Sequence, residues 1–299
     1  MFDTAVVVEG SRRNMGIHAL VSLSRAVTAS RHGGGPRRLA TRLRREGVAV
    51  LDDLLGELSN ERRNAIAEEA QCLLDRGIRA AILGERGYPA SLAQNRHAPP
   101  AFFFSGSLEQ LHRPAIGICG SRHASPEGLH AAQSCSSVAV NSGLAVVSGY
   151  ARGVDMAAHT AALAERGTTV IVLAEGIDHF RVRRGDFADV WDPSRAVVVS
   201  QFSPTQPWSA GAAMTRNTLI SGLSRALVVV EAGETGGTLA AGLHALERGQ
   251  SVIILRLFAA PAGNQILEDK GATPVHNRQE LRAALEDLPS NATGQLSLI

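Results

Sequence analysis

Three turns of the chain combine glycines, hydroxyl side chains or arginines, and each comes at the end of a run of β-forming residues, 115–120, 144–149 and 226–233. Glycine lets backbone amides approach an anion closely, and a guanidinium group forms paired hydrogen bonds with phosphate. These residue types in these positions predict a phosphate-binding surface. Its candidate residues are Gly120, Ser121 and Arg122, then Ser148, Gly149, Arg152 and Gly153, and finally Gly236, Gly237 and Thr238.

Two polar residues follow the second turn at a spacing that places them on one face of a helix. Asp155 precedes His159 by four residues. The aspartate either caps its helix or contacts a ligand, and the histidine either satisfies a buried hydrogen bond or contacts a ligand; the pattern leaves both alternatives open. Because neither Ser121 nor Ser148 lies in a G-x-S-x-G turn with a suitably placed histidine, a serine hydrolase is not expected.

Six short apolar runs, alternating with helical windows from about residue 114 onward, must position these turns. Each run is nearly continuously apolar, as expected for strands whose sheet is covered on both faces. We therefore predict an α/β fold with a doubly wound parallel sheet. Ligands bind at the carboxyl ends of the strands in such a sheet, so the three turns should meet at one edge. The other runs are 168–176, 196–202 and 251–257.

The first hundred residues are instead predicted to form short helices. Apolar residues recur at three- and four-residue spacing in 17–27 and 38–58. A further helix is predicted between an N-cap at Ser59 or Asn60 and a terminating Gly77.

Positive charge is concentrated near the N-terminus. From Arg12 to Arg45 the chain has nine arginines and no acidic residue, which predicts a local basic patch. The stretch 31–38, with three glycines and a proline, is expected to be a mobile basic loop.

The predicted organisation has four parts. A small helical domain, of sterile-alpha-motif or helix-hairpin-helix type and carrying the basic loop, covers 1–80. A connector covers 81–113, the sheet domain covers 114–288, and a flexible tail covers 289–299.

Composition excludes several classes of protein. The chain has 299 residues and a formal net charge of +2, so no strong overall field draws it to nucleic acid or membrane. Its three cysteines show no C-x-x-C spacing, which predicts neither a disulfide framework nor a zinc site, and no metal or cofactor is expected. With no apolar run that could span a bilayer and no signal-peptide pattern, a cytoplasmic location is expected.

Several stretches resemble the motifs of the DNA-processing protein A (DprA/Smf) family. The segment "GICGSRHASPEG" is similar to its G-S-R turn, and "SGYARGVDMAAHTAAL" to its S-G-x-A-x-G-I-D-x-x-A-H-x-x-A-L signature. The segments "TRNTLISGLS", "VEAGETGGTL" and "GNQILEDKGATPV" resemble later family motifs, and "GYPASLAQNRHAPPAFFFSGSL" the approach to its core domain.

The resemblance implies an extended Rossmann-like domain preceded by a helical domain, a homodimer, and a non-catalytic role. It also implies cooperative binding of single-stranded DNA that assists loading of RecA recombinase, as in natural transformation and DNA recombination. Arg122 is the strongest candidate for a phosphate contact, and Arg216 and Asn217 match the family's Arg-Asn pair. Phe180, Phe202 and Trp208 are candidates for stacking on bases.

This sequence departs from the family pattern near the expected groove. Thr218 replaces the second arginine of R-N-R, and Gly236 and Thr238 replace two serines. The Tyr-Pro of the third-strand motif is missing from 175–193, although "RVRR" adds basic charge there. No C-terminal winged helix is expected, and a role in phage or plasmid biology or in defence is a further alternative to transformation.

Two other interpretations stay open. The chain resembles, more weakly, nucleotide-cleaving hydrolases and nucleotide-ligand sensors of the same superfamily, in which Asp155 or Glu231 would supply an acid. The tail from Gln295 to Ile299, "QLSLI", resembles a peptide that docks on the sliding clamp, although a frayed terminus is the alternative.

Overall fold

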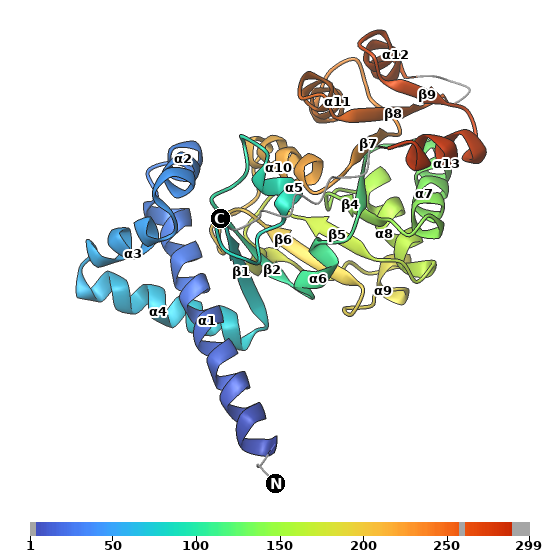
Figure 1. The fold of residues 1–299 in the computed structure, drawn as a ribbon. Coiled ribbons are helices and arrows are strands. Elements are labelled where there is room, and N and C mark those ends of the chain that lie inside the picture. Colours follow the sequence, from blue (N-terminus) through green and yellow to red (C-terminus); the bar gives the residue numbers. More distant parts are fainter. Residues whose placement is uncertain (1–3, 257–260, 289–299) are drawn as a thin grey trace. The chain divides into compact units, whose positions relative to one another are not determined.

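The computed structural model describes residues 4–256 and 261–288 (Figure 1). The chain forms two compact units, described in turn below. The first comprises Met1–Leu108, Leu173–Arg181 and Val197–Leu219, and the second comprises Glu109–Val172, Val182–Ala196 and Ile220–Ile299. The four-part division expected from the sequence stays a prediction, and the tail 289–299 lies outside the described residues.

The first unit begins with four helices, drawn in blue in Figure 1. They are α1 (Thr4–His32), α2 (Pro36–Glu46), α3 (Ala49–Gly56) and α4 (Asn60–Asp75). Leu23, Leu39 and Leu51 are fully buried among them, which gives these helices a common apolar core. The helices predicted from spacing are present, with the 38–58 stretch divided between α2 and α3, and Ser59 is the N-cap of α4, its side chain accepting a hydrogen bond from the backbone of Arg62. The expectation that the first hundred residues are helical is wrong at Ile78–Ile82, which form a strand.

The expected basic loop over 31–38 is wrong in extent. Only residues 33–35 lie outside helices, because Pro36 starts α2, where its missing N–H is not needed. The arginines of the wider basic stretch, from Arg12 to Arg45, are also partly neutralised by acids from elsewhere in the unit. Arg25 pairs with Asp52 at 2.6 Å and with Glu85 at 2.7 Å.

Three strands of the first unit form antiparallel pairs. β2 (Ala101–Ser105) lies beside β1 (Ile78–Ile82) and also pairs with β6 (Ala196–Ser200). The predicted run 196–202 is therefore a strand, but its pairing with β2 is antiparallel rather than parallel. The unit also includes α5 (Ala90–Ala93), the 3₁₀ turn Ile177–His179 and most of α10 (Ala210–Gly222).

The second unit contains the parallel sheet that the sequence predicts. Its strands lie in the order β5-β4-β3-β7-β8-β9, and every pair in that series is parallel. β3 therefore has β4 on one side and β7 on the other, which makes its carboxyl end the switch point where ligands bind in such sheets. The strands are β5 (Thr169–Val172), β4 (Ala145–Ser148), β3 (Ala115–Cys119), β7 (Ala226–Val229), β8 (Ser251–Leu255) and β9 (Thr273–Val275).

Helices complete the α/β architecture of this unit and confirm the fold class. Ile116, Val146 and Val228, from three adjacent strands, are fully buried, which explains the continuous apolar runs. No helix in the described part of the chain is long and apolar enough to cross a membrane. The helices are α6 (Leu108–Leu111), α7 (Pro126–Asn141), α8 (Val154–Ala164), α9 (Asp186–Asp189), α11 (Gly237–Glu247), α12 (Ala262–Asp269) and α13 (Arg278–Glu286).

Candidate functional site

The turns after β3 and β4 are in direct backbone contact. Gly153 has a φ of +78°, and a Cβ there would stand 2.3 Å from the carbonyl oxygen of Ser121. The backbone N–H of Val154 donates to that same oxygen at 3.2 Å. Since only glycine fits this position, the sequence fixes how closely the two turns approach. The exposed side chains of Arg122 and Arg152 therefore come from adjoining backbone segments.

The turn after β3 is also held by its other neighbours. A Cβ on Gly120 would lie 2.5 Å from the side chain of Val154, so this glycine too is required by close packing. Thr238, in the first turn of α11, donates its hydroxyl to the carbonyl of Gly120 at 3.0 Å. The hydroxyl of Ser121 accepts from the backbone of His123 at 3.0 Å. These contacts join the turns after β3, β4 and β7 along one edge, which we call the rim.

The turn after β7 supplies exposed backbone to the rim. Gly236 has a φ of +106° and is exposed, as is Gly237 at the start of α11. Thr238, which follows Gly237, is half-buried, and its hydroxyl is already bonded to Gly120. Glu234 is exposed in the same turn, so the rim is not uniformly basic.

The N-terminus of α7 already holds a carboxylate of the chain. Ser125 caps α7 by accepting from the backbone of Gly128 at 2.9 Å. The Glu231 carboxylate accepts from the backbone of Ser125 at 3.0 Å and also from its hydroxyl. A side chain on Gly128 would collide with this carboxylate. Glu231 therefore stabilises the helix terminus, and an incoming anion would meet the arginines rather than these amides.

Ser148, Asp155 and His159 support the rim from beneath. Ser148 is fully buried and donates to the carbonyl of Ile118 at 2.6 Å. The Asp155 carboxylate, 6% exposed, accepts from the backbone of Ala151 at 3.2 Å, so it stabilises the turn that carries Arg152. These bonds agree with the capping alternative for the aspartate.

His159 is fully buried, and both of its ring nitrogens have partners. Its Nε2 lies 2.6 Å from the carbonyl oxygen of Gly149, and Nδ1 lies 2.6 Å from the hydroxyl of Thr169. Because a carbonyl only accepts, Nε2 carries the proton and donates to Gly149. The buried-hydrogen-bond alternative therefore describes this histidine, which anchors the turn after β4 to β5.

Two residues that sequence reasoning did not assign, Tyr150 and Arg183, stack beside the second turn. The Arg183 guanidinium carbon lies 4.3 Å from the centre of the Tyr150 ring. Arg183 donates its backbone N–H to the Tyr150 hydroxyl at 3.1 Å and its Nη2 to the Tyr150 carbonyl at 2.5 Å. Burial raises the pKa of the Tyr150 hydroxyl, against the opposing effect of Arg183. The only sequence signal was the "RVRR" run in place of the Tyr-Pro motif.

The remaining predicted residues belong to the first unit. Arg216 and Asn217 lie within α10, where Arg216 is 7% exposed and Asn217 is half-buried. Trp208 is exposed, while Phe180 and Phe202 are half-buried. Their participation in the rim stays a prediction. Among the described residues, no three His, Cys, Asp or Glu side chains gather as a metal site would require.

Comparison with known proteins adds independent information. Residues 79–286 match the family model described as DNA recombination-mediator protein A. The chain is 31% identical over 202 residues to DNA processing protein DprA of Streptococcus pneumoniae, covering 67% of this chain and 71% of that protein. It is 34% identical over 178 residues to protein Smf of Escherichia coli, covering 59% of this chain but only 47% of that protein.

Two solved structures have the same fold. The X-ray structure of DNA processing protein A from Streptococcus pneumoniae aligns with a TM-score of 0.68 and 24% identity, covering 91% of this chain and 97% of that one. DNA processing protein A from Helicobacter pylori, in a study of its single-stranded DNA binding mode, aligns with a TM-score of 0.58 and 21% identity, covering 70% and 97%. At these identities the likeness concerns the fold alone.

Proposed function

Because the chain belongs to the DNA recombination-mediator protein A family, we propose that it binds single-stranded DNA at the rim and acts as a non-catalytic mediator of recombination. The observation that carries the proposal is the contact of Gly153 with the carbonyl of Ser121, since it brings two exposed arginines, Arg122 and Arg152, to adjoining positions at the switch point of the sheet.

The chemistry of the rim suits a phosphodiester backbone rather than particular bases. Guanidinium groups and exposed glycine amides bind phosphate oxygens, which every sequence presents. Binding of this kind releases counterions and weakens as salt rises. Among the described residues of the rim, the aromatic ring of Tyr150 is half-buried and covered by Arg183, so base stacking there is secondary. We therefore expect affinity that depends on strand length and salt more than on sequence.

The test is fluorescence anisotropy of a labelled oligothymidylate with the full chain at several salt concentrations. Arg122→Ala and Arg152→Ala should each weaken binding and reduce the salt slope by about one unit per lost phosphate contact. The matched control is Arg166→Ala, an exposed arginine at the opposite end of the strands. The proposal would be contradicted if the affinity changed neither with salt concentration nor in the two rim variants. An equal loss of affinity in Arg166→Ala would contradict it as well.

RecA loading and homodimer formation, which the family resemblance implies, belong to the same proposal. The first predicts that the full chain helps RecA to replace a single-strand-binding protein on DNA, and that Arg122→Ala loses this activity together with DNA affinity. The second is tested by light scattering on the same sample. The clamp-binding peptide Gln295 to Ile299 lies outside the described residues, and pull-down with and without these residues tests it.

Nucleotide cleavage is the less favoured function. Both candidate acids are engaged elsewhere, since Glu231 accepts from Ser125 and Asp155 accepts from the backbone of Ala151. A general acid must instead reach the bond that it protonates. Release of free base from nucleotide monophosphates by the full chain, lost on Glu231→Gln, would favour the hydrolase.

A further inference from the structure

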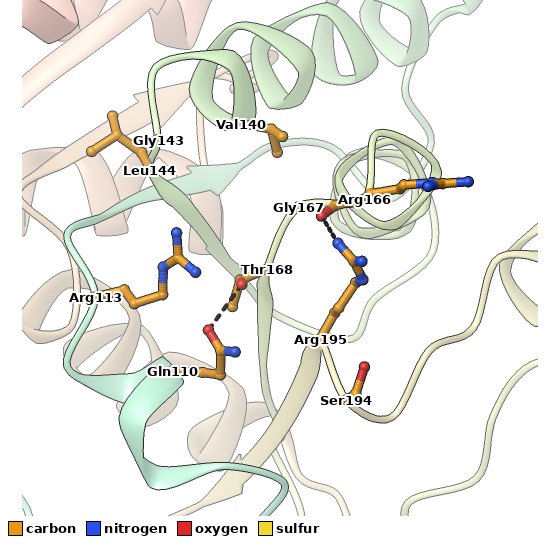
Figure 2. Close-up of a pocket in the computed structure, with 10 residues that line it drawn as sticks. All are labelled: Gln110, Arg113, Val140, Gly143, Leu144, Arg166, Gly167, Thr168, Ser194 and Arg195. Carbon is orange, nitrogen blue, oxygen red and sulfur yellow. Dashed lines mark hydrogen bonds between the residues drawn. The ribbon is translucent and has the colours of Figure 1, made fainter.

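A second basic site lies at the opposite end of the parallel sheet from the rim. A cavity of about 360 Å³ opens where β3, β4 and β5 begin, and Figure 2 shows its lining. The backbone N–H of Ala145 donates to the carbonyl of Pro114 at 2.9 Å, and that of Thr169 to the carbonyl of Arg195 at 2.9 Å. These bonds join the segments that carry the lining side chains, so the sheet itself fixes the shape of the cavity.

Two guanidinium groups face each other across this cavity. Figure 2 shows Arg113 and Arg195 on either side of Thr168, while the side chain of Arg166 extends away. Arg113 has no side-chain hydrogen bond or ion pair with any residue in the described parts of the chain. Its guanidinium group is therefore available to a ligand.

Arg195 is held in place from behind. Its Nε donates to the Asp192 carboxylate at 3.0 Å, and its Nη1 donates to the carbonyl of Arg166. Hydrogen bonds from Ser194, and then the bond from Arg195, hold the pKa of Asp192 below its usual range, so this carboxylate is charged. Asp192 offsets part of the charge of Arg195, but it does not line the cavity. The Nη2 group of Arg195 forms none of these bonds and is left for a ligand.

Neutral polar side chains occupy the floor between the two arginines. The hydroxyl of Thr168 donates to the side-chain oxygen of Gln110 at 3.0 Å, which turns the amide nitrogen of Gln110 outward with two hydrogens to donate. The hydroxyl of Ser194, which lies below Arg195 in Figure 2, already donates to the Asp192 carboxylate at 2.6 Å. No carboxylate is among the lining residues. The amide nitrogen of Gln110 and the two guanidinium groups are therefore the donors that the cavity presents, together with an excess of positive charge.

We propose that this cavity binds the phosphate or diphosphate group of a small molecule. Two guanidinium groups flanking the amide nitrogen of Gln110 match a tetrahedral dianion, which accepts hydrogen bonds on several sides. The volume is at the small end of the range for ligand pockets, which suits a compact ligand. The site is separate from the rim, since β4 alone spans about 13 Å at roughly 3.3 Å per residue.

Titration calorimetry of the full chain with inorganic pyrophosphate, and separately with inorganic phosphate, tests the proposal. The wild type should bind at least one of them, and Arg113→Ala should weaken that binding at least tenfold. Because Arg113 makes no side-chain bond to another described residue, this variant should unfold at the same temperature as the wild type. Thr168→Val, which keeps the side-chain volume, should weaken binding less.

Arg166→Ala is the matched control, because it removes a neighbouring positive charge whose side chain points away from the cavity. It should change the affinity by less than twofold, as should Arg122→Ala at the rim. The proposal is overturned if neither anion binds at millimolar concentration, or if Arg166→Ala costs as much as Arg113→Ala. It is also overturned if Arg113→Ala weakens oligothymidylate binding by the same factor, since the cavity would then belong to the strand-binding surface.

Discussion

Gly153 lies against the carbonyl oxygen of Ser121 so closely that a Cβ at position 153 would stand 2.3 Å from that oxygen. The obstacle is backbone on both sides, so no side-chain rotation relieves it. The glycine also holds a positive φ, +78°, that other residues adopt only with strain. One residue thus satisfies two requirements at the point where the turns after β3 and β4 meet.

Gly153→Ala should lower both stability and DNA affinity. The strained φ costs about 1–2 kcal/mol, and relieving the clash requires the turns carrying Arg122 and Arg152 to separate, so we expect a total loss of about 2–4 kcal/mol and several-fold weaker binding. Gly249→Ala is the control, because Gly249 has a φ of +70° but nothing within 4 Å of a Cβ. Gly249→Ala should lower the free energy of unfolding only by the cost of the strained φ, and it should leave the DNA affinity measured by anisotropy unchanged. Equal losses of stability and DNA affinity in the two variants would show that the contact of Gly153 with the Ser121 carbonyl has no special role.

Glu231→Ala should destabilise the protein while strengthening DNA binding. The carboxylate accepts two hydrogen bonds from Ser125 at the start of α7, and losing them should cost about 1–3 kcal/mol. The same change removes a negative charge close to the turn that bears Arg122, so an approaching phosphate meets less repulsion. Urea unfolding and anisotropy measure the two effects. Glu234→Ala, at an exposed position in the same turn, should leave stability within about 0.5 kcal/mol of the wild type.

The sequence was sufficient to predict the parallel sheet and the turns at its edge. Continuous apolar runs such as 226–233 reflect burial on both faces, and glycine is common in strand-to-helix turns, which made Gly120 and Gly153 recognisable. The contacts that exclude a side chain at these two positions are with the other turn and were not predictable. The strand over 101–105 escaped prediction. The prolines and turn residues around it resemble a connector, although all five of its residues pair with β1 and three of them also pair with β6.

Contacts between distant residues could not be predicted in the same way. Ser125 is recognisable as an N-cap, but its partner Glu231 is 106 residues away, and no local sequence pattern predicts this contact. Likewise, the basic run containing Arg183 indicates charge, whereas its stacking on Tyr150 depends on the fold bringing positions 33 apart together. The arginines near the N-terminus show the converse, because acids such as Asp52 and Glu85 neutralise a charge that the sequence suggests is free.

Arg183→Ala should weaken DNA binding about three- to tenfold, because Arg183 holds the turn after β4 in position. It removes the stack on Tyr150 and the hydrogen bond to the Tyr150 carbonyl, with a loss of about 1–2 kcal/mol in the free energy of unfolding. Arg183→Lys keeps the charge but not the planar stack, so it should resemble the alanine variant. Arg184→Ala, an exposed neighbour, is the control. A loss with Arg184→Ala as large as that with Arg183→Ala would mean that charge alone matters.

Stability should fall steeply in alkali because of buried tyrosine. The chain has only two tyrosines, and burial raises the pKa of Tyr88, whose hydroxyl donates to the carbonyl of Pro99 at 2.7 Å; burial also raises that of Tyr150. A raised pKa means that the folded state keeps protons that the unfolded chain releases above about pH 10. The contribution of the tyrosines to stability is therefore fully present below that pH and is lost as the pH rises.

Tyr88→Phe should flatten this decline, and at neutral pH it should cost about 1 kcal/mol for the lost hydrogen bond. Burial also raises the pKa of the Cys135 thiol to about 12, so Cys135→Ala should flatten the decline further. Urea unfolding at several alkaline pH values measures the slope, and tyrosinate absorbance follows ionisation directly because only two rings contribute. Tyrosinate absorbance of both residues while the protein is still folded would contradict this account, since it would show that Tyr88 ionises without unfolding.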